Sequence, residues 1–319
     1  MNNYRSALPA LLAMTACFCA QAGIPEIAPR VPYRSAIAVD AGTGNVLFDD
    51  QSTTSAHPAS CTKLMTLLLV LEDIRAKRYS LSDTAEASVY AARFGGSSFG
   101  IKAGTVLTID DLIYALVVKS ANDGALVLAE FAVSRAEANR PPETTTPPTN
   151  APNPLTESKR RVRAFIDRMN RRAQELGMKD TRFVSPNGMT PYLGQAYPGY
   201  DVSTAADLAK LARRLVTLPE AFAYTSCAAH AITVGDRKIE LVAHNYFLPG
   251  THDPKQYATP LPECDGLKTG FTDSAGASIV LTAQRKGRRV VAVVLGSDSR
   301  KARETAAGRI LRAALDAIQ

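Results

Sequence analysis

Strand-like segments near both ends of the chain enclose a long run of helical patterns, and this arrangement limits the folds open to it. Apolar residues predict strands at 35–40, 45–48, 278–282 and 289–295. The first two flank a Gly-rich turn and read as a β-hairpin. The expected fold is therefore α/β (α+β), with an antiparallel sheet from both chain ends flanked by helices and a helical subdomain inserted between. The sheet is expected from about 31–59 and 228–319, and the helical region at about 60–227.

Helical periodicity fills the middle of the chain and closes it. Helices are expected at about 60–71, 108–118, 123–138, 160–177, 203–217 and 302–318. The Pro- and Thr-rich segment 139–158 cannot bury enough apolar surface to order itself, which predicts a flexible surface insertion. Because helical periodicity resumes at Val162, the insertion need not divide the domain, and 31–319 is expected to form one unit.

The first residues have the pattern of an export signal. A short basic lead is followed by an apolar stretch from Ala7 to Ala20, and Ala20-Gln21-Ala22 has the small-x-small form of a cleavage site. We expect residues 1–22 to be a signal peptide and the mature protein to be exported, to the periplasm or cell envelope. Lipid attachment at Cys17 is an alternative. No other segment is long and apolar enough to span a bilayer, so no transmembrane anchor is expected after signal removal.

Charge and cysteine content exclude some classes of function. The 319 residues carry 37 basic and 30 acidic side chains, a net charge of +7 that suits an anionic partner without naming one. No motif of a nucleic-acid-binding protein accompanies the basic residues. Beyond the signal, Cys61, Cys227 and Cys264 show no metal-ligand spacing, and no metal is expected. They read as small buried hydrophobes, with a disulfide between Cys61 and Cys264 as an alternative.

Ser60 and Lys63 are the first candidates for chemistry. They begin an apolar helical run, and residues three apart share a helix face, so the Lys63 amine can reach the Ser60 hydroxyl. A serine hydroxyl becomes a good nucleophile only when a neighbouring base takes its proton. A lysine is such a base only where its surroundings keep it neutral, as a buried apolar helix does. Ser-x-x-Lys alone is a weak signal.

Two further motifs strengthen that signal. Ser120-Ala121-Asn122 falls between two predicted helices, where a turn can present a hydroxyl and an amide to a cleft. Lys268-Thr269-Gly270 precedes a predicted strand, and on an edge strand its side chains can bind a substrate carboxylate. Alone, the first is an ordinary helix cap and the second an ordinary turn. The combination in this order is far more specific, since the same three motifs occur together in penicillin-binding proteins and class A β-lactamases.

From about Ser35 to its end the sequence resembles the low-molecular-mass penicillin-binding proteins, the serine D-Ala-D-Ala carboxypeptidase family. Besides the three motifs, matching segments are found at 58–66, 95–104, 176–183, 201–207 and 265–272. The resemblance implies a β-lactamase/transpeptidase-like fold. It also implies that the protein trims the terminal D-Ala from peptidoglycan stem peptides, that β-lactam antibiotics inhibit it covalently, and that no cofactor is needed.

The resemblance implies a role for each motif residue. Ser60 would form the acyl-enzyme, Lys63 would be the general base, and Ser120 would carry the proton to the leaving amine. Asn122 would orient Lys63 and the substrate amide. The substrate carboxylate would be held by Lys268 and Thr269, with Arg303 supporting it at a distance. The backbone N–H groups of Ser60 and Phe271 would form the oxyanion hole.

Departures from the family pattern keep alternatives open. Asn187 stands where many relatives carry His, and Cys61 where a larger apolar residue is usual. The chain ends at the predicted closing helix, without the family's C-terminal β domain and membrane anchor, which raises the expectation of D,D-endopeptidase activity on crosslinks. A class A-like β-lactamase would need Glu157 as the deacylation base. A non-catalytic penicillin-sensing protein is the remaining alternative.

Overall fold

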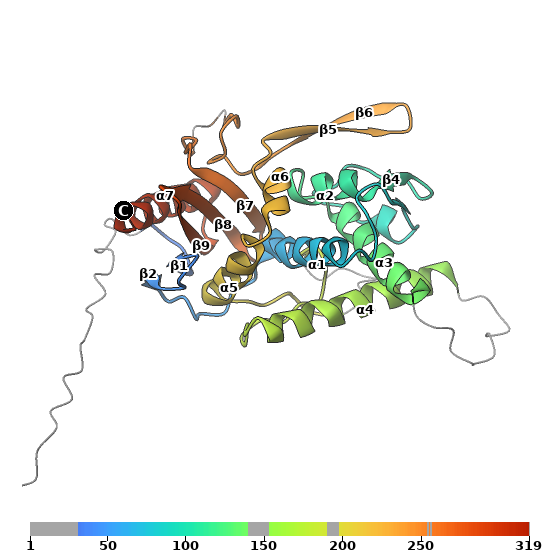
Figure 1. The fold of residues 1–319 in the computed structure, drawn as a ribbon, viewed down its shortest axis with the longest axis horizontal. Helices are drawn as coiled ribbons and strands as arrows, with labels where there is room; N and C mark the ends of the chain where they lie inside the picture. The colour runs from blue at the N-terminus through green and yellow to red at the C-terminus, as the bar shows by residue number, and fades with distance from the viewer. Residues whose placement is uncertain (1–30, 140–152, 190–197, 254, 256, 319) are drawn as a thin grey trace, which may run out of the picture.

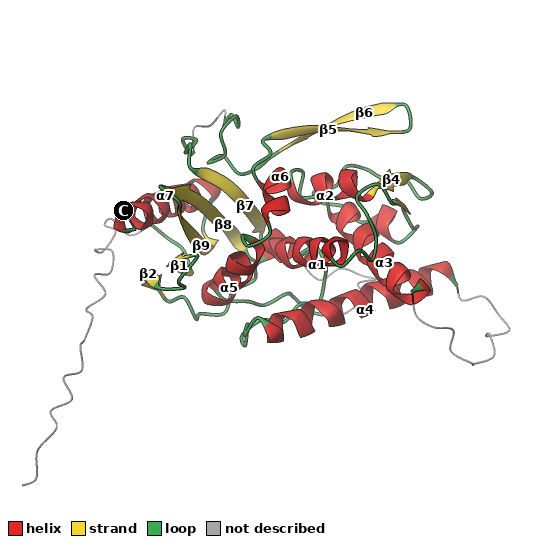
Figure 2. Ribbon diagram, viewed as in Figure 1, coloured by secondary structure: helices red, strands yellow, loops and turns green. Residues whose placement is uncertain are grey.

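The computed structural model describes residues 31–139, 153–189, 198–253, 255 and 257–318. The predicted signal peptide, including Cys17, and most of the predicted insertion lie outside the described residues. A five-stranded antiparallel sheet and a group of helices stand side by side (Figures 1 and 2). No helix within the described residues combines the length and apolar character that crossing a bilayer requires.

The sheet joins strands from the two ends of the chain. Its order is β2-β1-β9-β8-β7, and every neighbouring pair is antiparallel. The strands are β1 (Ser35–Asp40), β2 (Val46–Asp50), β7 (Cys264–Thr272), β8 (Gly276–Arg285) and β9 (Arg288–Ser297). Strands β8 and β9 are buried along most of their length, as expected of strands covered on both faces. Helices α5 (Ala205–Leu215) and α7 (Arg300–Ala317) pack on the sheet. The predicted α/β class and antiparallel sheet are confirmed.

The helical region lies between the two halves of the sheet in sequence. It contains α1 (Lys63–Arg75), α2 (Ile109–Val117), α3 (Asn122–Ala138), α4 (Pro154–Glu175) and α6 (Phe222–Thr225), with 3₁₀ turns η1 (Ala59–Thr62), η2 (Ala91–Arg93) and η3 (Pro219–Ala221). Two small antiparallel sheets of two strands each accompany it, one of β3 (Thr84–Glu86) and β4 (Val106–Thr108), the other a hairpin of β5 (Ala229–Val234) and β6 (Arg237–Val242).

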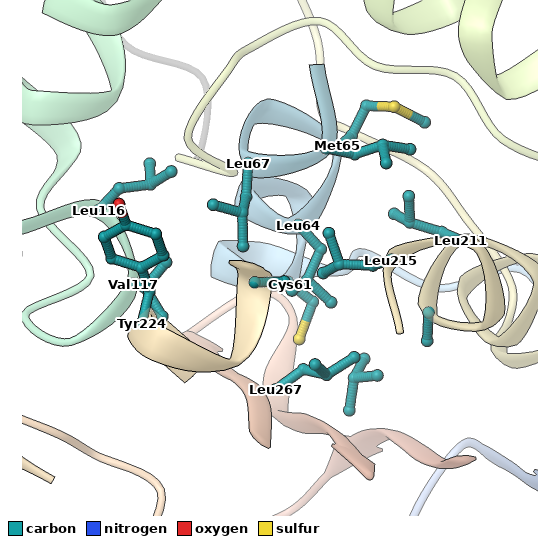
Figure 3. Packing of buried hydrophobic residues seen from close by; sticks show 14 of the residues in the cluster. Cys61, Leu64, Met65, Leu67, Leu116, Val117, Leu211, Leu215, Tyr224 and Leu267 are labelled. Carbon is teal, nitrogen blue, oxygen red and sulfur yellow. The ribbon is translucent and has the colours of Figure 1, made fainter. Parts of the chain in front are cut away.

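Helix α1 is the central helix of the core. Leu64, Met65 and Leu67 are almost completely buried, and they lie close to side chains from α2, α5, α6 and β7 (Figure 3). Full burial of each such side chain stabilises the fold by about 1.5–3 kcal/mol. From Leu64 to Leu71 every residue of the helix except Thr66 is apolar, as expected of a helix segment that other elements enclose. The start of α1, where the candidate nucleophile lies, is therefore fixed between the sheet and the helical region.

Three expectations from the sequence need correction. Helix α4 begins at Pro154, so the end of the segment predicted to be flexible is helical, because the Asn153 side chain caps it and proline occupies its first turn. Residues 229–242 were expected to join the main sheet but pair only with each other, as β5 and β6. Lys268-Thr269-Gly270 lies inside edge strand β7 and not before a strand. The sequence did not indicate this strand because the glycines at 266 and 270 interrupt its apolar pattern.

Candidate active site

Ser60 and Lys63 meet at the junction of η1 and α1. The Lys63 Nζ lies 2.9 Å from the Ser60 Oγ, 2.8 Å from the Asn122 Oδ1 and 2.6 Å from the Asn187 carbonyl oxygen. The Lys63 side chain is only 1% exposed, whereas Ser60 is half-buried. The amine is thus fixed by contacts from three separate segments, and only the serine reaches the surface of the cleft.

The surroundings of Lys63 favour its neutral form. Burial lowers the pKa of the Lys63 amine well below its ordinary value of 10.5, and the positive charge of Lys268 lowers it further. The buried carboxylate of Asp201 acts in the opposite direction but does not reverse the shift. A neutral amine has a lone pair, which is what a base next to a serine hydroxyl requires.

The turn between α2 and α3 places Ser120 and Asn122. Ser120 has a left-handed backbone conformation, with φ of 61°, and α3 begins two residues later. The Asn122 Nδ2 donates to the Gly95 carbonyl at 2.9 Å, which fixes the amide so that its oxygen faces Lys63. Ser120 lines the same cavity as Ser60. This position suits a hydroxyl that carries a proton to the leaving amine.

The edge strand β7 supplies the opposite wall. Lys268 and Thr269 are buried, and the Lys268 Nζ donates to the Thr269 carbonyl at 3.0 Å. Burial lowers the pKa of Lys268 to about 8, so the side chain keeps most of its positive charge at neutral pH. Phe271 is 44% exposed, and the guanidinium of Arg300 lies 5.2 Å from its ring centroid.

A cavity of about 240 Å³ lies between these walls. Four of the seven site residues predicted from the sequence line it: Ser60, Ser120, Thr269 and Phe271. The other three, Lys63, Asn122 and Lys268, are buried behind its surface. The structure thus brings the three motifs into one site, although they are far apart in the sequence.

Several cavity residues were not foreseen from the sequence. Ser97, His244, Tyr246 and Arg300 line the cavity. Ser97 lies in the matching segment 95–104 but was given no role, and no local pattern marks the other three as functional. Burial lowers the pKa of His244 to about 4, and the nearby cations, Lys268 first among them, lower it further. Neutral His244 and the arginines leave this wall without negative charge, which suits an anionic group on a substrate.

Arg303, which the resemblance suggested as a distant support, also lines the cavity. Its guanidinium pairs with the buried carboxylate of Glu304, and its Nη1 lies 3.5 Å from the Ser278 carbonyl oxygen. Arg303 is therefore anchored from behind, while one side of it faces the cavity.

Asp201 lies in the matching segment 201–207, but the resemblance gave it no role. Its carboxylate accepts hydrogen bonds from the backbone N–H groups of Val184 and Ser185 and from the hydroxyls of Ser185 and Thr62. Burial raises the pKa of Asp201, and these hydrogen bonds counteract the rise. Through them Asp201 joins η1 to the loop whose Asn187 carbonyl contacts Lys63.

Two glycines allow this close packing around the nucleophile. A Cβ on Gly188 would lie 1.9 Å from the Ala59 carbonyl oxygen, and a Cβ on Gly270 would lie 2.7 Å from the Pro58 carbonyl oxygen. Both contacts are with backbone atoms, which cannot move aside as a flexible side chain can. Only glycine fits at these two positions.

The three cysteines within the described residues form no disulfide. Cys61, Cys227 and Cys264 are all free thiols, so the alternative of a Cys61–Cys264 bridge is wrong. The Cys61 side chain points toward β7 near Leu267 (Figure 3), and its Sγ lies 3.7 Å from the Lys268 carbonyl oxygen. Burial raises the pKa of Cys61 to about 11, so the thiol is unreactive and serves as packing between η1 and β7.

Glu157, the residue that a class A-like β-lactamase would need, lies in the first turn of α4. It forms ion pairs with Arg160 and Arg161 and is not among the described residues that line the cavity. These arginines hold the pKa of Glu157 below its usual value. A carboxylate so occupied is poorly placed to activate a water at Ser60.

Comparison with known proteins agrees with the fold and the motifs. Residues 24–138 and 161–299 match the model of the D-alanyl-D-alanine carboxypeptidase family, peptidase S11. The protein therefore belongs to this family, as the sequence resemblance indicated.

Relatives and solved structures extend the match. The chain is 29% identical to the D-alanyl-D-alanine carboxypeptidase DacF of Bacillus subtilis over 87% of this chain and 61% of DacF. Its fold is similar to that of DacD from Francisella tularensis, with a TM-score of 0.73, 24% identity, and coverage of 90% of this chain and 71% of that one. It is also similar to ampicillin-bound penicillin-binding protein D2 of Listeria monocytogenes, with a TM-score of 0.67, 26% identity, and coverage of 88% and 97%. The chain spans about three fifths of the length of several curated relatives, 61% of DacF of Bacillus subtilis and 63% of DacD of Escherichia coli.

Proposed function

We propose that this protein is a penicillin-binding serine D-Ala-D-Ala carboxypeptidase that removes the terminal D-Ala from peptidoglycan stem peptides. The observation that carries the proposal is the buried Lys63 amine, 2.9 Å from the Ser60 Oγ and held by Asn122 and the Asn187 carbonyl. A neutral amine beside a hydroxyl at the edge of a cavity provides a nucleophile and its base. The names of the relatives and the family support the choice of substrate.

Acylation follows from this geometry. The Ser60 Oγ attacks the carbonyl carbon between the two D-alanines while its proton passes to the Lys63 Nζ. The oxyanion that forms accepts hydrogen bonds from the backbone N–H groups of Ser60 and Phe271. The C–N bond then breaks, the leaving nitrogen takes the proton from Lys63 through the Ser120 hydroxyl, and free D-Ala departs. The donor remains bound to Ser60 as an ester.

Deacylation uses the same groups in reverse. A water molecule gives a proton to Lys63 and attacks the ester carbonyl, and the proton then returns to the Ser60 Oγ as the C–O bond breaks. A β-lactam would enter the same sequence at the attack step, since its strained amide takes the place of the peptide bond. The ampicillin complex of the Listeria relative supports this assignment.

Binding of the terminal carboxylate is assigned to the wall formed by β7 and α7. Lys268 supplies positive charge, the Thr269 hydroxyl supplies a hydrogen bond, and Arg303 adds a second cation within the same cavity. A carboxylate in such a site gains charge-assisted hydrogen bonds, which are about twice as strong as neutral ones. We assign the protein to the periplasm or cell envelope on the strength of the predicted signal peptide and its family.

The function is tested by offering the purified protein a pentapeptide ending in D-Ala-D-Ala and, separately, a crosslinked muropeptide. We expect release of free D-Ala from the pentapeptide, measured by a coupled D-amino-acid oxidase assay, at several times the rate of crosslink cleavage. Crosslink cleavage with little D-Ala release would replace the proposal by the endopeptidase alternative. If labelled penicillin binds but neither substrate is cleaved, the protein is a sensor and the enzymatic proposal is wrong.

We expect kcat/KM to decrease as the pH rises through about 8. The folded-state pKa of Lys268 is about 8, below the ordinary 10.5, so this side chain is charged below pH 8 and loses its charge as the pH rises through that value. An anionic substrate then binds less well. Lys268→Arg keeps the charge to a higher pH and should remove this limb, with Lys210→Arg as the matched surface control. An unchanged alkaline limb in Lys268→Arg would contradict the assignment.

A further inference from the structure

Helix α7 contains a buried carboxylate that the proposed mechanism does not use. Glu304 follows Arg303 in the first half of α7, and its side chain is fully buried, while that of Arg303 is 3% exposed. Charged side chains are almost never buried so completely unless they are paired. Arg303 lines the active-site cavity, whereas Glu304 is not among the described residues that do so. The carboxylate therefore lies behind the cavity wall, next to a cation that faces the cavity.

Glu304 makes the closest polar contact of the Arg303 guanidinium. The Nη2 of Arg303 donates to the Glu304 Oε1, while its Nη1 lies 3.5 Å from the Ser278 carbonyl oxygen, which is long for a hydrogen bond. The Arg303 Nε has no hydrogen-bond partner within the described part of the chain. A guanidinium is a rigid plane with five N–H donors, so a carboxylate that fixes one edge also fixes where the other donors point.

The other buried carboxylate near this pair is already engaged elsewhere. Asp253 is 8% exposed, and its two oxygens accept the backbone N–H groups of Lys255 and Tyr257 within its own loop. Burial raises the pKa of Glu304, and the positive charge of Arg303 opposes this rise. Among the described residues, Glu304 is thus the carboxylate that pairs with Arg303 and balances its charge.

The orientation of Arg303 matters for the proposed substrate. In the proposed function the terminal carboxylate lies against Lys268, Thr269 and Arg303. A guanidinium binds a carboxylate strongly only when its N–H bonds point at the carboxylate oxygens. Arginine has a long side chain with many rotamers, and binding must overcome the entropy of ordering them. A contact that already holds the guanidinium in the binding orientation removes that cost.

We propose that Glu304 is a positioning residue for substrate recognition. It holds the guanidinium of Arg303 from behind, so that the remaining N–H groups stay directed at the terminal carboxylate of the peptide. This inference rests on the proposed function, since that function places the carboxylate beside Arg303. Through Arg303, Glu304 then contributes to the preference for peptides whose last residue has a free carboxylate over peptides in which that group is an amide.

The test compares two peptides that differ only at this group, Nα,Nε-diacetyl-L-Lys-D-Ala-D-Ala and its C-terminal amide. The ratio of their kcat/KM values, carboxylate over amide, measures recognition of the carboxylate and cancels any general loss of activity. Glu304→Ala is expected to lower this ratio about tenfold, the loss of one hydrogen bond to a charged group, mainly through a higher KM for the carboxylate peptide. Glu304→Gln keeps an acceptor oxygen for Arg303 and should keep the ratio within about twofold.

Two further variants keep the test decisive if Glu304→Ala does not fold. Glu304→Asp retains the charge but shortens the side chain by one methylene group, so the ratio should again fall. In a protein that already carries Arg303→Ala, Glu304→Ala should cause no further loss, because its effect passes through Arg303. The double variant also removes both charges of the buried pair. Glu240→Ala, at an exposed position of β6, is the matched control and should leave the ratio unchanged.

The outcomes separate this inference from the proposed function. An unchanged or higher ratio in Glu304→Ala and Glu304→Asp would overturn the inference and leave the function intact. So would an equal loss in Glu304→Gln and Glu304→Ala, or a further loss when Arg303 is already alanine. Absence of D-Ala release from the carboxylate peptide by the unaltered protein would instead overturn the proposed function, and this inference with it.

Discussion

Ser60→Ala is expected to abolish both labelling by fluorescent penicillin and D-Ala release, with a loss of at least about 1000-fold in kcat. In the proposed mechanism the Ser60 Oγ bonds to the substrate, and among the described hydroxyls that line the cavity it is the one with a hydrogen bond to the Lys63 Nζ. The substitution removes one half-buried hydroxyl and should leave the fold unchanged. Labelling followed by gel electrophoresis and a D-Ala assay measure both effects.

The neighbouring thiol provides the control for this experiment. Cys61→Ala removes a side chain of similar size one residue away, but the raised pKa of that thiol makes it unreactive. We expect Cys61→Ala to keep penicillin labelling, with some loss of stability from the cavity it leaves. If Ser60→Ala retained labelling and Cys61→Ala lost it, Cys61 and not Ser60 would be the nucleophile.

Lys63→Arg is expected to lower the acylation rate by about 100- to 10,000-fold, the range of a lost general base. Arginine stays protonated at every accessible pH and so has no lone pair to accept a proton, whereas the lowered pKa of buried Lys63 favours a neutral amine. The acylation rate of wild type should fall as the pH falls through the Lys63 pKa, because the protonated amine cannot accept the Ser60 proton. Stopped-flow measurement of β-lactam acylation tests both points.

Two further variants separate loss of the base from loss of the fold. Lys63→Met is neutral and close in shape, so it should fold well yet acylate as slowly as Lys63→Arg. Lys210→Arg makes the same chemical change on the surface of α5, where Lys210 pairs with Asp207, and should acylate at the unaltered rate. Rapid acylation by Lys63→Met would show that another group takes the Ser60 proton.

The parts of the site that could be predicted from sequence are those that local spacing fixes. Ser60 and Lys63 share one helical turn, and Ser120 and Asn122 share one interhelical turn, so each pair could be placed before the fold was known. The fold class followed from the strands at the two chain ends, because strands so placed must pair with each other to bury their faces.

What could not be predicted depends on contacts between distant segments. The Asn187 carbonyl contacts Lys63 from a loop that Asp201 joins to η1 and that the Thr66 hydroxyl joins to α1. A contact made by a backbone oxygen does not depend on the side chain at that position, so the sequence does not reveal it. His244 lines the cavity from a loop, and Arg300 lines it from the start of α7. The residues around them in the sequence form no recognisable motif. Strand β7 was misplaced because its glycines, which the close packing requires, are poor strand formers.

The backbone around Ala59 is enclosed on two sides, by Gly188 from the helical region and by Gly270 from the sheet. The candidate nucleophile Ser60 is thus held between the two halves of the protein and does not belong to one of them alone. Neither half alone can contain a formed active site, and any hinge motion between them would displace Ser60 from one of its two supports. We therefore expect the two halves to act as one rigid unit in the proposed reaction, with substrate specificity set by side chains at the rim of the cleft and not by closure of one half onto the other.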